Sequence, residues 1–288
     1  MVTDFCRFVG GKKFSYKKFN AKGESKKYDR EKIEKKMASD ILKMRELQDK
    51  FYAGSQESFL VIFQAMDAAG KDGAIKHVMS GINPQGVKVS SFKQPSAEEA
   101  AHDYLWRACR ALPKKGEIGI FNRSYYEDVL IAKVHKLYKI QRLPQRCMTK
   151  DIIKRRYEEI VNFEKYLWQN GVTVVKFFLC ISKSEQKKRF MSRIVDTSKN
   201  WKFSQSDLKE RDYWDDYMKA YESAINSTSR KNAPWYIVPS DKKWYARAFV
   251  LSVMLETLKK INPQYPKFQK EKRGKLLEYK KILLSEKD

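Results

Sequence analysis

The chain has 288 residues, with 60 Lys and Arg against 35 Asp and Glu, which gives a formal net charge of +25. Its 42% hydrophobic and 13% aromatic residues are enough to bury a core, so the composition excludes a wholly disordered chain. No apolar run approaches the roughly 20 residues of a membrane span, and no secretory signal begins the chain, so we expect a cytoplasmic protein without a membrane partner.

The predicted elements alternate between helices and buried strands. Residues 1–28 read as an irregular N-terminal arm, and the three- and four-residue spacing of apolar positions over 29–53 predicts a helix ending at Gly54. Continuous apolar runs predict strands at 59–63, 87–92, 118–121, 172–181 and 235–238. Helical spacing follows at 96–111 (opened by a capping box at Ser96), 124–136, 149–170, 183–196, 206–227 and 243–261. This alternation predicts one α/β core over residues 29–262, a three-layer sandwich around a parallel five-stranded sheet. Residues 263–288 form a basic tail that we expect to be an appended helix or a partly mobile tail.

The large positive charge indicates an anionic partner. Composition alone does not decide whether that partner is nucleic acid, anionic lipid, or a polymeric or phosphorylated small substrate. The four cysteines are widely spaced and the three histidines scattered, which argues against a disulfide framework and a zinc site.

The segment after the first strand predicts a phosphate-binding loop. A strand, a turn of small residues, a Gly-Lys pair and a helix occur in the order that directs backbone N–H groups and a lysine at one phosphate. The predicted ligand-binding residues of this loop are Ala68, Ala69, Gly70, Lys71, Asp72 and Gly73. Asp67 is unusual beside a polyanion unless a metal lies between them, so we interpret it as a Mg²⁺ ligand supported by Asp72. The alternative is a fortuitous turn in which Asp67 only caps the helix.

The end of the strand at 118–121 carries a second group of candidates. Ligands of open parallel sheets bind beyond the carboxyl ends of strands, where this strand runs into Asn122, Arg123 and Glu127. Asn122 keeps an oxygen that could orient the metal or its waters, and Arg123 could stabilise a phosphoryl group during transfer. Glu127 lies about one turn further, at the mouth of the site. The alternative is an ordinary capped helix, with Arg123 in a surface ion pair.

Several motifs in order resemble the polyphosphate kinase family 2, and the resemblance spans roughly residues 30 to 260. The residues that carry it lie at 66–73, 95–99, 102–107, 116–124, 156–160, 162–164, 201–204 and 207. The resemblance implies a P-loop kinase-like core with a helical lid at about 182–216. It also implies reversible, Mg²⁺-dependent phosphoryl transfer between inorganic polyphosphate and adenine, or also guanine, nucleotides.

Glu127 resembles the residue of the class III subgroup, which accepts both nucleoside mono- and diphosphates, so we expect AMP and ADP to be converted to ATP. Asn122 departs from the Asp of many relatives. Relatives are commonly dimers or tetramers, which implies a homodimer or homotetramer.

In the predicted lid, Arg189 and Arg193 are one helical turn apart and could clamp one anion together, with Lys202 in the loop that follows. A solvated basic face is the alternative for this charged segment.

Two other functions would also fit the phosphate-binding loop or the positive charge. An ATP-dependent nucleotide kinase of thymidylate-kinase type would share the loop, and a basic nucleic-acid-binding P-loop protein would explain the charge, although no nucleic-acid motif is visible and we expect no such partner.

Overall fold

The computed structural model describes residues 6–267 and 270–286. Five parallel strands form the sheet, as expected: β2 (Ser58–Ala65), β3 (Val87–Ser91), β4 (Ile118–Asn122), β5 (Val172–Cys180) and β6 (Trp235–Pro239). The order across the sheet is β1-β6-β5-β2-β4-β3, so the two longest strands, β2 and β5, are central neighbours. Every residue of β2 is buried, which explains the uninterrupted apolar run at 59–63.

The sheet has six strands and not the expected five, because an antiparallel strand is added at its edge. Two residues of the N-terminal arm form β1 (Arg7–Phe8), which pairs antiparallel with β6. The arm then stays attached, because the backbone N–H of Phe14 donates to Asn226 Oδ1 over 2.7 Å and the Asn226 amide returns a bond to the Phe14 carbonyl. A two-residue strand carries no readable period, so the apolar pattern could not reveal it.

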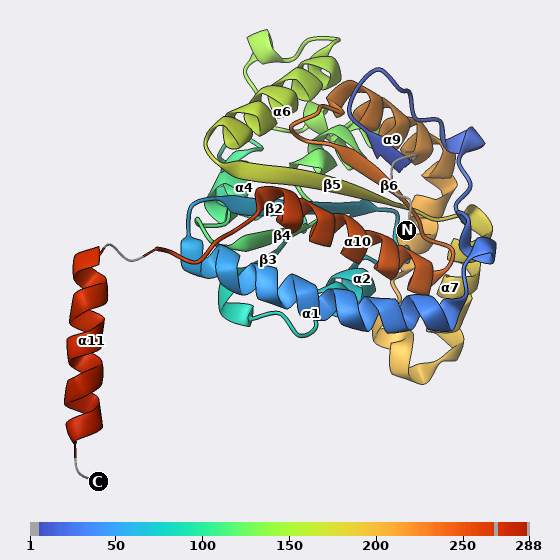
Figure 1. The fold of residues 1–288 in the computed structure, drawn as a ribbon. Helices are drawn as coiled ribbons and strands as arrows, with labels where there is room; N and C mark the ends of the chain where they lie inside the picture. Colours follow the sequence, from blue (N-terminus) through green and yellow to red (C-terminus); the bar gives the residue numbers. More distant parts are fainter. Residues whose placement is uncertain (1–5, 268–269, 287–288) are drawn as a thin grey trace.

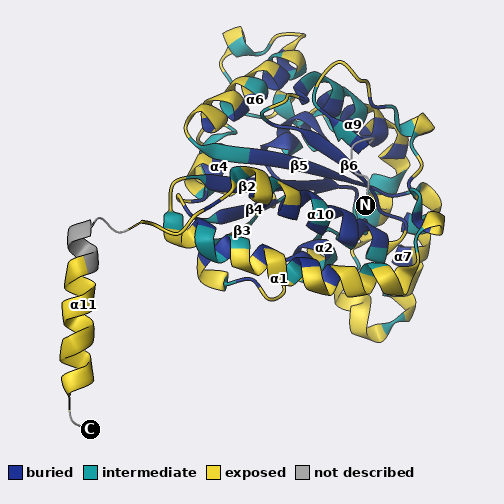
Figure 2. Cartoon of the chain, viewed as in Figure 1, coloured by how far each residue is buried: buried dark blue, intermediate teal, exposed yellow. Residues whose placement is uncertain are grey.

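Helices cover both faces of the sheet in three layers (Figure 1). One face is covered by α1 (Arg30–Gly54), α2 (Lys71–Val78) and α10 (Lys243–Ile261), and the other by α6 (Ile152–Gln169) and α9 (Trp214–Thr228). The remaining short α-helices are α3 (Ala97–Ala100), α4 (Trp106–Ala111), α5 (Ile131–Val134) and α8 (Gln205–Glu210). The buried residues gather on the sheet and on the inner faces of these helices (Figure 2).

Three expected helices are interrupted. The helix predicted at 96–111 splits into α3 and α4, and Asp103 accepts a bond from the Leu105 N–H in the gap. The segment at 124–136 begins as the 3₁₀ helix η5 (Tyr125–Val129) and continues as α5, while α8 and the 3₁₀ helix η9 (Arg211–Tyr213) precede α9. The capping box at Ser96 is confirmed, with both of its bonds to Glu99 present.

The segment expected to be a lid comprises α7 (Lys183–Val195), the 3₁₀ helix η8 (Thr197–Lys202) and α8. At the other end of the molecule, α11 (Lys270–Ser285) extends away from the body, and its described side chains are exposed (Figures 1 and 2). Among the described residues, none of the helices combines the length and the apolar character that crossing a bilayer requires.

Candidate active site

The turn between β2 and α2 is shaped to approach a ligand closely. Ala68 and Gly70 both take left-handed backbone conformations, with φ of 60° and 105°. That conformation is strained for alanine, and residues held in it cluster at binding and catalytic sites. The turn ends where Lys71 begins α2, so the positive end of the helix and its unpaired N–H groups face the same space.

The Lys71 side chain reaches back from the start of α2 to the end of β2. Its ammonium donates to the Ala65 carbonyl at the end of β2 over 3.3 Å. Burial lowers the pKa of Lys71 and the positive Arg123 lowers it further, whereas Asp67 and Glu127 oppose that change. An anionic ligand would add to this opposing effect, so the lysine is placed where phosphate would stabilise its charge.

Two side chains of α7 hold the carbonyl side of the turn. The Arg189 guanidinium donates to the carbonyls of Ala68 at 3.1 Å and Ala69 at 2.7 Å, and on its other side to those of Ser240 and Asp241. Gln186 donates to the Asp67 carbonyl over 2.8 Å. The turn is therefore fixed to α7 through its carbonyls, and within the turn the Ala69 N–H donates to the Met66 carbonyl over 3.2 Å.

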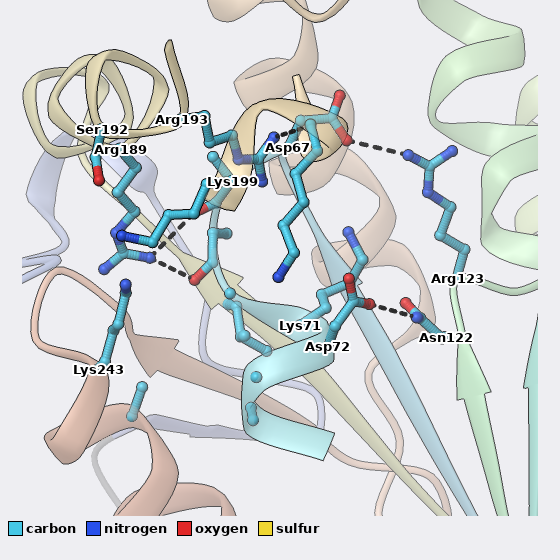
Figure 3. Close-up of a pocket in the computed structure, with 18 of the residues that line it drawn as sticks. Asp67, Lys71, Asp72, Asn122, Arg123, Arg189, Ser192, Arg193, Lys199 and Lys243 are labelled. Carbon is cyan, nitrogen blue, oxygen red and sulfur yellow. Dashed lines mark hydrogen bonds and ion pairs between the residues drawn. The ribbon is translucent and has the colours of Figure 1, made fainter. Parts of the chain in front are cut away.

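Residues at the end of β4 reach the same turn. Arg123 donates to Asp67 Oδ1 over 3.0 Å, and the Asn122 amide donates to Asp72 Oδ1 over 2.7 Å (Figure 3). Strand β4 is the direct neighbour of β2, with Phe63 in register with Asn122. Parallel pairing thus brings together the four candidates that lie some 50 residues apart in the sequence.

Glu127 lies on η5, just behind Arg123. Its desolvation raises the pKa of the carboxyl group, while the positive charges of Arg123 and Lys71 lower it. When the Gln64 amide is oriented so that its oxygen accepts from Ser124, its nitrogen donates to Glu127 Oε1 over 2.8 Å. Glu127 is thus in electrostatic contact with the predicted catalytic residues, although it does not line the cleft itself.

The turn opens into a cleft of about 1010 Å³ at the carboxyl edge of the sheet. Basic side chains dominate its walls, against three acidic ones: Asp67, Asp72 and Glu185. The ten basic residues are Lys71, Lys93, Arg123, Lys188, Arg189, Arg193, Lys199, Lys202, Lys243 and Arg247, many of which are drawn in Figure 3. Such a charge density within one cleft favours a ligand with many negative charges.

Five of these cations were not among the predicted site residues: Lys188 and Lys199, which belong to the expected lid, and three that follow strands of the sheet. Lys93 follows the end of β3, and Lys243 and Arg247 begin the helix after β6. The rule that ligands bind beyond the carboxyl ends of parallel strands would have indicated all three, because each comes shortly after a predicted strand. Trp201, with its side chain 79% exposed, also lines the cleft, and Lys202 lies over its ring.

The two lid arginines bind different partners rather than one point. Arg189 is buried against the turn, whereas Arg193 donates to the Lys202 carbonyl at 3.1 Å and to Asp207 at 3.3 Å. Helical spacing correctly placed both on the cleft side of α7. Helical spacing could not reveal that the Arg189 guanidinium donates its hydrogen bonds to backbone carbonyls.

Asp67 could hold a divalent cation. Its side chain is 29% exposed in the cleft, and Arg123 engages its Oδ1. In the described part of the chain, no three His, Cys, Asp or Glu residues are arranged to bind a metal by themselves. A divalent metal at Asp67 would thus take most of its oxygen ligands from phosphate and water, as Mg²⁺ does in many phosphoryl-transfer sites.

Known proteins resemble this chain in both sequence and fold. A family model described as Polyphosphate kinase 2 (PPK2) matches residues 27–266. The chain is 49% identical over 250 residues to an ADP-polyphosphate phosphotransferase of Rhodopseudomonas palustris, a match covering 86% of each chain. It is 46% identical over 224 residues to an AMP/ADP-polyphosphate phosphotransferase of Meiothermus ruber, covering 78% of this chain and 80% of that one. The crystal structure of polyphosphate kinase 2 from Arthrobacter aurescens TC1 matches with a TM-score of 0.84 and 40% identity over 94% of both chains.

Proposed function

Since the chain belongs to the polyphosphate kinase 2 family, we propose that it transfers the terminal phosphoryl group of inorganic polyphosphate to both AMP and ADP. The protein is a phosphotransferase that uses polyphosphate to phosphorylate nucleotides. The observation that carries this function is the cleft in which a phosphate-binding turn is surrounded by ten Lys and Arg side chains. A linear polyanion needs many spaced cations, whereas a single nucleotide needs few.

The transfer is a displacement at phosphorus. An oxygen of the acceptor's terminal phosphate attacks the end phosphorus of polyphosphate, and the bond to the bridging oxygen breaks with its electrons leaving on the shortened chain. The acceptor gains one phosphate and the polymer loses one, so the reaction is reversible in principle. Little covalent chemistry is required of the protein, because positioning and charge stabilisation dominate such reactions.

Individual residues would supply those two contributions. Lys71 and the N–H groups of the turn would bind the transferring phosphoryl group, and Arg123 would neutralise charge as it moves. Lys202 and Arg193 would help to bind the polymer, and Arg189 would act from behind the turn through the Ala68 and Ala69 carbonyls.

A divalent metal accompanies catalysis in this family, and we propose that here it is Mg²⁺. Bound with phosphate, this ion would neutralise part of the charge that develops during transfer. Asp67 would be its protein ligand. Asn122 is the weaker candidate, because its amide nitrogen is engaged with Asp72 and only its carbonyl oxygen could contribute.

Use of both AMP and ADP is proposed from two observations. The relative from Meiothermus ruber carries both nucleotides in its name, and Glu127 occupies the position that resembles the dual-specificity subgroup. A cytoplasmic location is a further proposal, and it comes from the apolar pattern of the sequence. A homodimeric or homotetrameric assembly and the use of guanine nucleotides are proposals that come from the resemblance alone.

The deciding experiment incubates the purified protein with polyphosphate, Mg²⁺ and either AMP or ADP, and follows the nucleotides by chromatography. We expect ADP and then ATP from AMP, and ATP from ADP. Formation of ADP alone from AMP would contradict dual specificity but not polyphosphate-dependent transfer. A parallel reaction with ATP and thymidine monophosphate tests the nucleotide-kinase alternative, and oligonucleotide binding across a salt series tests the nucleic-acid alternative.

A further inference from the structure

A charged side chain lies in the centre of the sheet, away from the cleft. Lys176 is in the middle of β5, in register with Ile62 on one side and Trp235 on the other, and is 0% exposed. Glu164 of α6 lies 2.6 Å from its ammonium and is 1% exposed. Neither residue takes part in the chemistry proposed above.

The ammonium has three donors, and the structure provides three acceptors. Lys176 donates to Glu164 Oε2 at 2.6 Å, to the Thr228 carbonyl at 2.9 Å and to the Tyr126 hydroxyl at 3.0 Å. Burial raises the pKa of Glu164 and lowers that of Lys176, and the ion pair opposes both changes. The pair is thus fully satisfied by hydrogen bonds, the condition under which buried charges are tolerated.

Two adjacent tyrosines connect this ion pair to η5. The hydroxyls of Tyr125 and Tyr126 lie 3.0 and 2.9 Å from the same oxygen of Glu164, Oε1. Both rings are 0% exposed, and their centroids lie 5.2 Å apart. Tyr126 also lies 2.9 Å from Thr228 Oγ1, so η5 is anchored to β5, α6 and α9 at once.

Arg123, two residues before this anchored segment, has a strained backbone. Arg123 has a φ of 64°, in the left-handed region that a long side chain rarely adopts. On its N-terminal side its N–H donates to the Phe63 carbonyl of β2 over 3.0 Å. On its C-terminal side the two tyrosines are anchored to the ion pair. Strain of this kind persists only where the surroundings over-determine the conformation.

Stability alone does not account for a charged pair at this position. Replacing buried ion pairs by well-packed apolar residues often leaves stability unchanged or raises it. A fully connected polar network instead fixes one arrangement of the groups that it joins. Here the groups joined are Tyr125 and Tyr126, which lie two and three residues after Arg123.

We propose that Glu164 and Lys176 are positioning residues that act through Tyr125 and Tyr126 to hold Arg123 against Asp67 in the cleft. This inference rests on the proposed function, because it assigns the pair a role in phosphoryl transfer. The pair touches neither substrate nor the reacting atoms. Its contribution is the orientation of the Arg123 guanidinium.

The test removes the connection while keeping the rings. Tyr125→Phe with Tyr126→Phe keeps the packing of both side chains but removes the hydroxyls that bond Glu164. We expect kcat with polyphosphate and ADP to fall about 10- to 100-fold, as small misplacements of catalytic groups can do. The KM for polyphosphate should change less than about twofold, because most of the cations that line the cleft are untouched.

A double-mutant cycle shows whether the loss acts through Arg123. In an Arg123→Ala background the tyrosine substitutions should lower kcat by less than about threefold, because the group that they position is gone. An equal loss in both backgrounds would overturn the inference. The matched control is Tyr157→Phe, which removes another buried tyrosine hydroxyl from α6, outside this network, and should leave kcat unchanged.

A second variant guards against misfolding of the first. Glu164→Leu with Lys176→Met removes both charges without leaving either one unpaired, and it should show the same kcat loss with the same dependence on Arg123. Retention of full kcat by this variant, with melting temperature and circular dichroism unchanged, would also overturn the inference. Absence of wild-type turnover with polyphosphate would instead contradict the proposed function, so the two failures are distinguishable.

Discussion

Two turns at the carboxyl edge of the sheet each contain a residue other than glycine in the left-handed conformation, Ala68 after β2 and Arg123 after β4. The first turn is held from its carbonyl side, by Arg189 and Gln186 of α7. The second turn is held by the side chains of the two buried tyrosines that follow it, whose hydroxyls bond Glu164.

The difference follows from what each turn must present. The turn after β2 offers N–H groups to an anion, so its carbonyls are the groups free to be bonded from behind. The turn after β4 offers one guanidinium, and the backbone that carries it must be fixed instead. The first turn is therefore anchored through its carbonyls, and the second through the Arg123 N–H and the neighbouring tyrosine side chains.

The largest effect should come from the first turn. Lys71→Ala or Asp67→Ala should lower kcat by about 10²–10³-fold or more, as expected for the loss of one preorganised electrostatic group. Steady-state turnover of ADP with polyphosphate measures the loss. The control is Lys76→Ala, an exposed lysine of the same helix that does not line the cleft and should keep normal kcat. Near-normal turnover by either Lys71→Ala or Asp67→Ala would contradict the role given to that residue.

The anchoring of the first turn is tested at Arg189. Arg189→Lys keeps the charge but cannot reach four carbonyls at once, so kcat should fall about tenfold or more. The ligand-free protein should also lose about 1–3 kcal/mol of unfolding free energy, because buried carbonyls are left without donors. Turnover and urea unfolding measure the two effects.

Arg110→Lys is the matched control for this variant, since Arg110 is exposed, pairs with Glu98 on the surface and does not line the cleft, so kcat and stability should stay normal. A stable Arg189→Lys protein with a raised KM for polyphosphate alone would indicate that Arg189 clamps the anion instead, as helical spacing had suggested.

The same contrast explains what could be predicted from the sequence. The turn after β2 is a local pattern of strand, small residues, Gly-Lys and helix, so its residues were identifiable in one window. The family resemblance is confirmed, and so are the five parallel strands. Four of these strands are largely buried, whereas β3 lies at the edge of the sheet and has no buried residue. The network behind the second turn was not predicted, since Glu164 and Thr228 lie 39 and 102 residues from the tyrosines that they bond. A lysine in an apolar run gives no sign of its partner.

A smaller effect is expected at Glu127, whose contribution to the melting temperature should depend on pH. Burial raises the pKa of Glu127 above its ordinary 4.5, so the folded protein binds this proton more tightly than the unfolded chain does. The group therefore favours folding at low pH, and that contribution disappears as pH rises through the raised value. Glu127→Gln should melt at a higher temperature than wild type at pH 8, with the difference shrinking toward pH 5. A difference that is constant across this range would contradict the raised pKa of Glu127.

The smallest effect is expected when either of two serine helix caps, Ser124 or Ser96, is removed. Ser124 is 0% exposed and accepts a bond from the Tyr126 N–H at the start of η5, while Ser96 accepts from the Glu99 N–H on the surface. Ser124→Ala and Ser96→Ala should each lower the unfolding free energy by about 1 kcal/mol, as cap removal generally does. Only Ser124→Ala should also lower kcat, because only that cap belongs to the segment that orients Arg123. Equal turnover by the two variants would mean that η5 keeps its position without its cap, and that the buried tyrosines alone are sufficient to hold the second turn.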